Sequence, residues 1–228
     1  MEKRERGRKA LFNLYKNFIN NNSLIFDIGA NIGEYTKVFH RFGRVIAIEP
    51  QSYLAKLLRQ RFYKNNNITI IQKGVAEKEG IEKILINSGN RGISSFRKDD
   101  TYQNKFVGEK ADASSEIEMT TLDNLIKDYG LPEFIKIDVE GYESKVLKGL
   151  HSKVKLISFE FGTDFLEDLK QCIDLITKID KNYSFNLLLA GKFSFELNKW
   201  VNKEKLMKFI LNPKSNSFGE IFCKLKTN

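Results

Sequence analysis

Acidic side chains stand at the ends of short apolar runs at several points in this sequence. Asp27 follows residues 24–26, LIF; Glu49 follows residues 44–48, RVIAI; and Asp138 lies within FIKIDVEG. Short apolar runs bounded by turn-forming residues are typical of buried parallel strands. A carboxylate at the end of such a strand faces the edge of the sheet where ligands bind. There it can accept hydrogen bonds from hydroxyl groups, take up a proton or bind a metal ion.

A glycine turn follows the first of these strands. Gly29 and Gly33 bracket the sequence ANI, and a helical pattern begins at residue 34. A strand, a glycine turn and a helix N-terminus form a cradle for a nucleotide cofactor, because glycine lets the backbone approach the ligand and the first helical turn offers free N–H groups. The dinucleotide fingerprint GxGxxG lacks its middle glycine here, since Asn31 takes that place. This disfavours NAD or FAD and favours S-adenosylmethionine, which carries no phosphate.

The second strand supplies a carboxylate for the ribose of such a cofactor. Glu49 lies 22 positions after Asp27 (49 minus 27), which is the spacing at which an acidic residue recognises ribose hydroxyls. S-adenosylmethionine also needs an acidic group near the end of the first strand, and Asp27 meets that need. A solvated acid at the end of the strand is the alternative interpretation of Glu49.

Two charged residues interrupt the apolar pattern of FIKIDVEG. Strand alternation places Lys136 and Asp138 on one face, although a central parallel strand is expected to be apolar on both faces. Burying either charge alone would cost free energy, so we expect them to pair with each other, or with Asp27 or Glu160. We favour an active-site role for this strand over a purely structural ion pair.

Methyl transfer from a sulfonium gives these carboxylates a role. The reaction is an in-line displacement, and a base must remove the proton of a hydroxyl acceptor. Asp138 and Glu140 are the candidate bases, Glu160 in SFEF is a third carboxylate expected at the same edge, and Lys136 completes the candidate catalytic set. The three acids could instead bind Mg²⁺, which would lower the pKa of the acceptor. We favour the metal-free base, and the metal stays open.

A doubly wound sheet is needed to bring these residues together. The first half of the chain alternates strands with helices at about residues 33–41 and 52–64, which predicts a parallel α/β sheet. The strands of this half are expected at residues 24–27, 44–48 and 68–71. Residues 81–87 and 116–121 alternate apolar and polar side chains and are expected to be inserted strands. The polar stretch between them, residues 88–115, is typical of a lid, a binding loop or a disordered segment.

The second half of the chain completes the predicted sheet. Helices are expected at residues 122–129, 143–150, 165–179 and 203–211. Strands are expected at residues 134–139, 155–161, 185–189 and 220–224, with residues 193–197 as a partner of the third of these. Residues 1–22 are interpreted as an N-terminal basic helix and residues 23–228 as a single domain. The helix places Leu11, Leu14, Tyr15 and Phe18 on one face, and we expect it to cover the sheet rather than lie on a membrane.

The net charge of +9 is concentrated at the ends of the 228-residue chain. Residues 1–16 carry +4 and residues 192–228 carry +5, so residues 17–191 are neutral. An enzyme acting on nucleic acid needs a basic surface around its active site, which this balance disfavours. Two distant cysteines and two histidines disfavour a disulfide framework and a structural zinc site. The basic N-terminus lacks a signal-peptide core, so we expect a cytoplasmic protein.

The motifs together resemble one family. DIGANIGEYT, AIEP, TLD at residues 121–123 and KIDVEGYESKVLKG are similar to the FkbM family of S-adenosylmethionine-dependent methyltransferases, over residues 24–161. The resemblance implies a class I methyltransferase fold, Rossmann-like, with a seven-stranded sheet that ends in an antiparallel strand. It also implies O-methylation of a hydroxyl on a sugar, glycan or small natural product.

Carried onto matching positions, the resemblance also implies which residues bind the cofactor. They are Asp27, Gly29, Asn31, Gly33 and Glu49, and the candidate set is completed by Ala30, Tyr35, Thr36, Pro50 and Asp138. Gly74 and Val75 follow the third strand and are expected to border the adenine. Residues 81–118 and those after residue 161 match no motif of the family, so we expect them to select the acceptor.

Other functions are weaker alternatives. An RNA methyltransferase would share the fold but needs a basic, aromatic surface. An NAD-dependent oxidoreductase is disfavoured by the incomplete glycine fingerprint. A non-catalytic cofactor-binding protein is disfavoured by the intact set of Asp27, Gly29, Gly33, Glu49 and Asp138. The expected partner is therefore a small-molecule or glycan acceptor, with attraction to a membrane surface as a lesser alternative.

Overall fold

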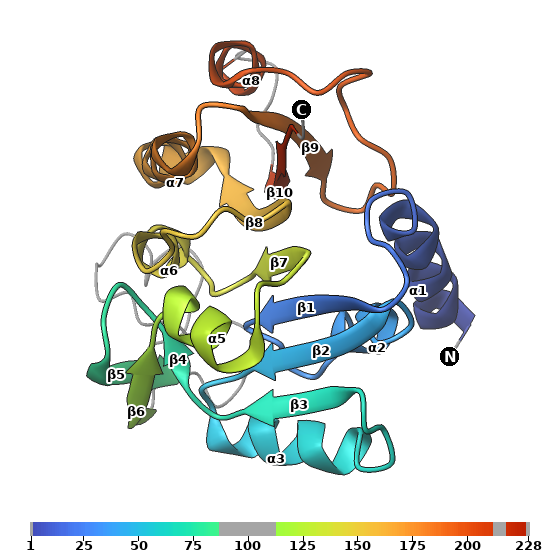
Figure 1. Cartoon of the computed structure of the whole chain (residues 1–228), viewed down its shortest axis with the longest axis vertical. Helices are drawn as coiled ribbons and strands as arrows, with labels where there is room; N and C mark the ends of the chain where they lie inside the picture. Colours follow the sequence, from blue (N-terminus) through green and yellow to red (C-terminus); the bar gives the residue numbers. More distant parts are fainter. Residues whose placement is uncertain (1, 87–112, 212–217, 227–228) are drawn as a thin grey trace.

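The computed structural model describes residues 2–86, 113–211 and 218–226. Its centre is a seven-stranded sheet that runs through the whole molecule (Figure 1). The strands, in spatial order, are β3 (Ile68–Ile71), β2 (Gly43–Ile48), β1 (Ser23–Ile28), β7 (Phe134–Ile137), β8 (Leu156–Gly162), β10 (Phe218–Leu225) and β9 (Tyr183–Leu189). The expected doubly wound α/β fold, with its antiparallel last strand, is confirmed.

The order of the strands creates the place where a ligand can bind. Strands β3, β2, β1, β7 and β8 are parallel, and β10 is antiparallel to both β8 and β9. Chain order reverses between β1 and β7, which lie side by side in the centre. Ligands of open parallel sheets bind beyond the carboxyl ends of the strands at such a reversal.

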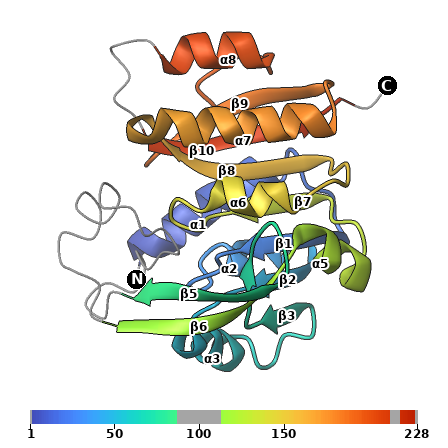
Figure 2. The same cartoon turned by 90° about the vertical axis from the view of Figure 1, so that its left-hand side faces the viewer.

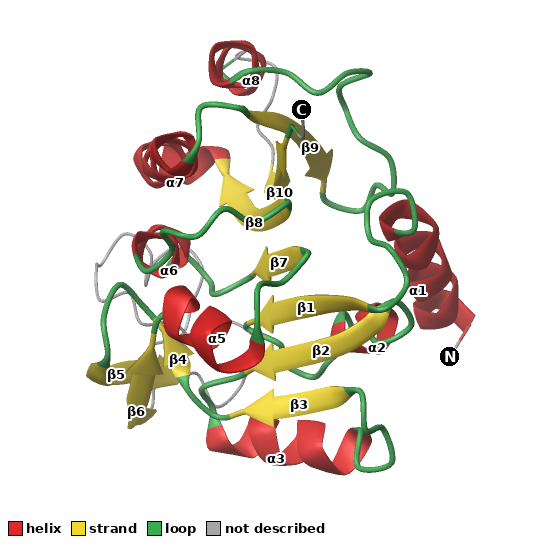
Figure 3. Ribbon diagram, in the orientation of Figure 1, coloured by secondary structure: helices red, strands yellow, loops and turns green. Residues whose placement is uncertain are grey.

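Helices cover both faces of the sheet (Figure 3). One core cluster joins residues of the sheet strands to residues of α5 (Leu122–Tyr129), α6 (Glu143–Lys148), α7 (Leu166–Ile179) and α8 (Lys203–Ile210). A second cluster joins other strand residues to residues of α1 (Glu2–Tyr15), α2 (Thr36–Phe39) and α3 (Ser52–Arg61). In Figure 2, α5, α6 and α7 lie in front of the sheet and α1 lies behind it.

Helix α1 packs against the sheet with its apolar face. Tyr15 is fully buried, and its ring lies 5.0 Å from the ring of Phe39, 5.4 Å from that of Phe134 and 6.1 Å from that of Phe222, centroid to centroid. Leu14 is also buried in this cluster. The helix ends at Tyr15, earlier than the sequence predicts, so Phe18 lies beyond it. Its apolar face covers the sheet as predicted. Among the described helices, none combines the length and the apolarity that crossing a bilayer requires.

The inserted strands form a small second sheet. Strand β5 (Gly80–Ile86) pairs antiparallel with β6 (Ala113–Thr120), and β6 pairs parallel with the short β4 (Gly74–Val75). Both predicted insertions are therefore strands, as expected. The polar stretch at residues 88–115 lies largely outside the described residues, so the prediction of a lid there stays a prediction.

Two predicted elements differ in the structure. The helix expected at residues 33–41 shrinks to α2, because the chain is still turning at Gly33, whose φ is +80°. Residues 193–197 do not form the expected strand. Instead the Asn186 side chain of β9 donates to the carbonyl of Leu197 at 2.9 Å and accepts from its N–H at 3.2 Å. The side-chain amide of Asn186 thus takes the place of backbone pairing at Leu197, while the N–H of Glu196 still donates to the carbonyl of Leu187 at 3.0 Å.

Candidate active site

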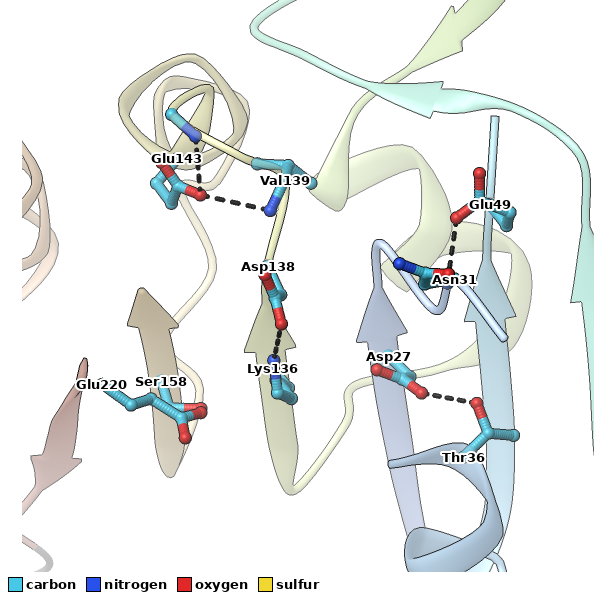
Figure 4. Close-up of polar contacts among 11 residues, drawn as sticks. Asp27, Asn31, Thr36, Glu49, Lys136, Asp138, Val139, Glu143, Ser158 and Glu220 are labelled. Carbon is cyan, nitrogen blue, oxygen red and sulfur yellow. Dashed lines mark hydrogen bonds and ion pairs between the residues drawn. The ribbon is translucent and has the colours of Figure 1, made fainter. Parts of the chain in front are cut away.

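The carboxyl end of β1 is fixed by a buried hydrogen bond. Asp27 is 1% exposed, and the hydroxyl of Thr36 donates to its Oδ2 at 2.5 Å. Burial raises the pKa of Asp27 to about 6, while the nearby ammonium of Lys136 and the Thr36 hydroxyl oppose the rise. Asp27 therefore ties the end of β1 to the start of α2 (Figure 4).

The two glycines of the turn make room for neighbouring parts of the protein. Gly29 has a φ of +81°, and a Cβ added there would lie 1.8 Å from the carbonyl oxygen of Asp138. A Cβ on Gly33 would lie 2.7 Å from side-chain atoms of Leu58 and Phe62. The absence of a Cβ thus lets β1 approach the end of β7 and lets the turn pack on α3. Contact of these glycines with a cofactor stays a prediction.

The amides of the turn are engaged within the protein rather than free. The N–H groups of Gly29 and Ala30 donate to the carbonyl of Ile48 at 2.9 and 3.0 Å. The N–H of Asn31, which has a φ of +49°, donates to Glu49 at 2.9 Å. The end of β2 therefore accepts the hydrogen bonds of these three amides. The expectation that free N–H groups of the first helical turn face a ligand stays a prediction.

Glu49 is the buried carboxylate at the end of β2. It is 3% exposed, its Oε2 accepts from Asn31 and its Oε1 accepts from the N–H of Gln51 at 2.9 Å. Burial raises its pKa to about 7, and the two amides oppose that rise. Each oxygen of a carboxylate has two lone pairs, so Glu49 can still accept a hydroxyl hydrogen bond on each oxygen.

The predicted ion pair forms at the carboxyl end of β7. Lys136 is 3% exposed, and its Nζ donates to Oδ2 of Asp138 at 2.7 Å. The same nitrogen lies 4.2 Å from the centre of the Tyr35 ring, in a cation–π contact. Burial disfavours the ammonium, but the carboxylates of Asp138 and Glu220 outweigh it and raise the pKa of Lys136 above its ordinary value. Lys136 therefore stays charged and orients Asp138.

A strained turn follows β7 and is held by Glu143. Glu140 and Gly141 both have positive φ, of 53° and 85°. The Oε1 of Glu143 accepts from the N–H of Val139 at 3.1 Å and from that of Gly141 at 3.3 Å. Burial raises the pKa of Glu143 to about 7. A non-glycine residue in the left-handed region is strained, so Glu143 fixes a turn that aims Glu140 at the edge of the sheet.

Three of the predicted catalytic residues converge beyond this edge. One carboxylate oxygen from each of Asp138, Glu140 and Glu160 lies within 4.8 Å of the other two. Burial, together with the charges of Asp138 and Glu140, raises the pKa of Glu160 to about 9. At neutral pH the cluster therefore holds a proton, which a divalent cation could replace.

Two cavities meet at Glu160. One, of about 260 Å³, lies between β8, η2 (Thr163–Phe165) and α7, and the other, of about 250 Å³, lies between α1 and the ends of β9 and β10. The second cavity is lined in part by Tyr35, Lys136, Asp138, Phe193 and Glu220. Glu160 and Phe218 line both cavities. The acidic cluster thus stands at a junction where two ligands could meet.

A family model described as the methyltransferase FkbM domain matches residues 27–186. The chain belongs to the FkbM methyltransferase family. The matched region runs from the end of β1 into β9, so it includes Glu49, the ion pair and the acidic cluster. Family membership makes the protein a methyltransferase that uses S-adenosylmethionine as its methyl donor.

Solved structures agree on the fold of this FkbM methyltransferase. A precorrin-6y C5,15-methyltransferase from Geobacter metallireducens is 11% identical, with a TM-score of 0.51 over 96% of this chain and 86% of that one. A candidate rRNA methylase from Clostridium thermocellum is 10% identical, with a TM-score of 0.50 over 97% and 96% of the two chains. At such identities the likeness concerns the class I methyltransferase fold alone. None of the curated proteins matches the sequence.

The donor set of this FkbM methyltransferase fits S-adenosylmethionine. Glu49 offers free lone pairs for two ribose hydroxyls beside a turn fixed by its own hydrogen bonds. Asp138 is 31% exposed at the neighbouring strand end. Carboxylates also suit the cationic ammonium and sulfonium groups of the cofactor. Pro50, also predicted to contact the cofactor, directly follows Glu49 after the end of β2.

Other candidates lie elsewhere in the structure. Gly74 and Val75 are buried in β4, where their backbone pairs with Met119 and Thr120. Contact of β4 with an adenine stays a prediction. His151 is hydrogen-bonded to Asp123 at 2.8 Å and lines neither cavity.

Sequence reasoning missed two acidic residues of this site. The sequence predicts only that a helix starts at Glu143, although a glutamate two residues after Gly141 is placed to accept the amides of the turn. Glu220 is buried in β10, where it accepts a hydrogen bond from Ser158 of β8 and contributes to the charge around Lys136. A glutamate within the apolar strand sequence FGEIFCKL breaks the same pattern as Lys136, so that rule could have found it.

Proposed function

We propose that this FkbM methyltransferase methylates a hydroxyl oxygen of a small molecule or glycan, and that the cluster of Asp138, Glu140 and Glu160 receives the hydroxyl proton. The observation that carries the proposal is the convergence of these three carboxylates within 4.8 Å, from the carboxyl end of β7, the turn after it and β8. A hydroxyl acceptor must lose a proton during methyl transfer. A neutral amine can accept the methyl group first and lose its proton to water afterwards, so it does not need a base in the site. A cluster of bases therefore favours an oxygen acceptor.

The cofactor is held, in this proposal, between the ends of β1, β2 and β7. Glu49 accepts the ribose hydroxyls, and Asp27 and Asp138 supply negative charge near the cationic groups. S-adenosylmethionine supplies a methyl group on a sulfonium, and transfer to the acceptor oxygen breaks the carbon–sulfur bond, leaves its electron pair on sulfur and releases the hydroxyl proton. The protein therefore has to orient the acceptor and take that proton.

Glu160 is the proton acceptor best suited to an alcohol. With a pKa of about 9, its ionised form is a stronger base than an ordinary carboxylate. Asp138 is oriented by Lys136 and can accept a hydrogen bond from the acceptor hydroxyl on its second oxygen. Because Glu160 must be ionised to act, turnover is expected to rise with pH between about 7 and 9.

Metal assistance is the competing mechanism, and the same cluster supports it. Mg²⁺ binds carboxylate oxygens and lowers the pKa of a coordinated hydroxyl, which would remove the need for a strong base. We favour the metal-free base. Loss of turnover in EDTA with recovery in Mg²⁺ would reverse this preference, while unchanged turnover in EDTA would support it.

The proposal is tested by a methyl-transfer screen. The whole chain is incubated with S-adenosylmethionine and a panel of alcohols, phenols, glycosides and a structured RNA, and the products are analysed by mass spectrometry. Methyl ethers are expected, and Asp138→Asn is expected to lower their rate of formation. Methylation of nitrogen, carbon or the RNA in preference to any hydroxyl would contradict the proposal.

A further inference from the structure

The cavity of about 260 Å³ beside Glu160 is lined by both apolar and acidic side chains. Its apolar lining comes from three elements and includes Phe161 of β8, Leu169 and Cys172 of α7, and Phe218 of β10. Its acidic lining consists of Glu140, Glu143, Glu160 and Asp168. Two of these acids, Glu140 and Glu160, belong to the cluster assigned to proton removal. The cavity therefore offers apolar contacts next to the proposed base.

The size of the cavity limits what can enter. A cavity of about 150 Å³ lined by apolar side chains holds one benzene molecule. The cavity beside Glu160 is larger, at about 260 Å³, so it suits a body of roughly ten non-hydrogen atoms, such as one substituted ring or two fused rings. A longer molecule would have to extend into solvent or into the second cavity, which shares Glu160 and Phe218 with the first.

The lining also distinguishes a sugar from a less polar alcohol. Every hydroxyl of a buried sugar needs a hydrogen-bond partner, because an unpaired buried polar group costs about 1–3 kcal/mol. Glu140, Glu160 and Asp168 can accept from a hydroxyl, but the Glu143 oxygen that accepts from Val139 and Gly141 is already engaged. The side chains of Phe161, Leu169 and Phe218 offer no partner to the other hydroxyls that a sugar carries. An apolar ring in contact with these side chains would instead gain the free energy of leaving water.

We propose that this cavity binds the methyl acceptor, and that the acceptor is an uncharged alcohol or phenol whose hydroxyl is carried by an apolar, ring-sized body rather than by a sugar. The ring contacts Phe161, Leu169 and Phe218, and its hydroxyl points to Glu160. The inference rests on the proposed hydroxyl methylation and narrows its substrate class.

Binding is measured separately from turnover. Naphthol and methyl glucoside are titrated into the whole chain saturated with S-adenosylhomocysteine, with calorimetry and saturation-transfer NMR as readouts. Naphthol is expected to bind at least about tenfold more tightly than the glucoside, which corresponds to about 1.4 kcal/mol. Equal affinities, or tighter binding of the glucoside, would overturn the inference.

Two variants locate the binding. Phe218 is 61% exposed, so Phe218→Ala should leave the fold intact, and it is expected to weaken naphthol binding about fivefold or more. The matched control is Phe209→Ala on α8, an exposed phenylalanine outside both cavities, which should leave the affinity unchanged. Leu169→Trp, which fills the cavity, is expected to abolish naphthol binding without changing the affinity for S-adenosylhomocysteine. Naphthol binding that survives both cavity variants would overturn the inference.

The outcomes separate this inference from the proposed function. If a glycoside is methylated on oxygen while naphthol does not bind, the proposed function stands and the inference fails. A second outcome is that naphthol binds in the cavity but the screen yields methyl transfer to carbon or nitrogen only. The cavity would then stand as a binding site, but hydroxyl methylation would fail. The assignment of the cavity to a hydroxyl acceptor would fail with it.

Discussion

Glu160 and Asp138 belong to one cluster, but their negative charges have opposite effects on the stability of the folded protein. Glu160 has no cation bonded to it in the described structure, and burial with two neighbouring acids raises its pKa to about 9. Asp138 compensates the buried ammonium of Lys136 at 2.7 Å. Ionisation of Glu160 therefore opposes folding, whereas ionisation of Asp138 supports it.

Amide substitutions of these two residues should separate the two effects. Glu160→Gln and Asp138→Asn are both expected to lower turnover by about a hundredfold, because each removes a proton-accepting group. Glu160→Gln should raise the Tm at pH 8, and Asp138→Asn should lower it, because Lys136 loses its partner. A change of 1 kcal/mol corresponds to about 2–4 °C in a protein of this size. Thermal unfolding and initial rates measure both quantities.

The outcome for Asp138→Asn distinguishes a catalytic from a structural role. A lower Tm with unchanged turnover would make the Lys136–Asp138 pair purely structural. Turnover that falls more than the affinity for the cofactor supports the assignment to the active site. For Glu160→Gln, a lower Tm would contradict the argument that its charge opposes folding.

The sequence was enough to predict the main carboxylates of the site and one ion pair. Lys136 and Asp138 were predictable because charges on a central parallel strand need a partner, and the nearest in sequence is the one observed. Glu143 and Glu220 were not predicted, because their roles depend on a turn with positive φ and on which strand becomes the neighbour of β8. Those relations arise only when the chain folds.

At the scale of elements, the junction of β1 with β7 depends on one missing side chain. Gly29 has a φ of +81°, and a Cβ added to it would lie only 1.8 Å from the carbonyl oxygen of Asp138. Any side chain there must push β1 away from β7 or deform the turn. The same displacement would move Asp138 away from the glycine turn, so the fold and the site depend on this glycine together.

Alanine at two glycines tests this dependence. Gly29→Ala is expected to lower the free energy of unfolding by at least about 2 kcal/mol, from backbone strain and the clash with Asp138. Gly7→Ala is the control, because Gly7 lies in α1 with nothing within 4 Å of an added Cβ. It should raise the free energy of unfolding by about 0.5–1 kcal/mol. Urea denaturation measures both, and a Gly29→Ala variant as stable as wild type would refute the steric argument.

Strands were easier to predict than the elements around the glycine turn. The apolar run at residues 68–71 matches β3 residue for residue, because turn-forming residues bound it on both sides. The helix after Gly33 was predicted too long, since its periodic pattern does not reveal that Asn31 and Gly33 adopt left-handed conformations. The strand expected at residues 193–197 failed because the side chain of Asn186 takes the hydrogen bonds of Leu197.

At the scale of the whole molecule, buried acids set how stability depends on pH. The pKa values of Asp27, Glu49, Glu143 and Glu160 are raised to about 6, 7, 7 and 9. Above pH 5 the folded protein therefore binds protons that the unfolded chain has already released. The free energy of unfolding falls with rising pH wherever the folded state binds more protons.

The Tm is accordingly expected to fall as the pH rises from about 5 to about 9. The lowered pKa values of Glu34, Asp123 and Glu133 act in the opposite sense and remove stability in acid, so the maximum should lie near pH 5. Thermal unfolding of the protein without cofactor at constant ionic strength measures the curve. A Tm that rises steadily from pH 5 to pH 9 would contradict the assignment of these four carboxyls as buried and proton-binding.

The central claim is that the ends of β1 and β2 form the cofactor site, with Glu49 as the ribose ligand. Calorimetric titration of S-adenosylmethionine into the wild type and into Glu49→Gln tests it most directly, with the exposed Glu79→Gln as a control. We predict one site per chain in the wild type and the control, and an affinity about 10–100-fold lower in Glu49→Gln, because hydrogen bonds to a charged group contribute about 1.5–3 kcal/mol. Absence of binding to the wild type, or equal affinity in Glu49→Gln, would contradict the claim.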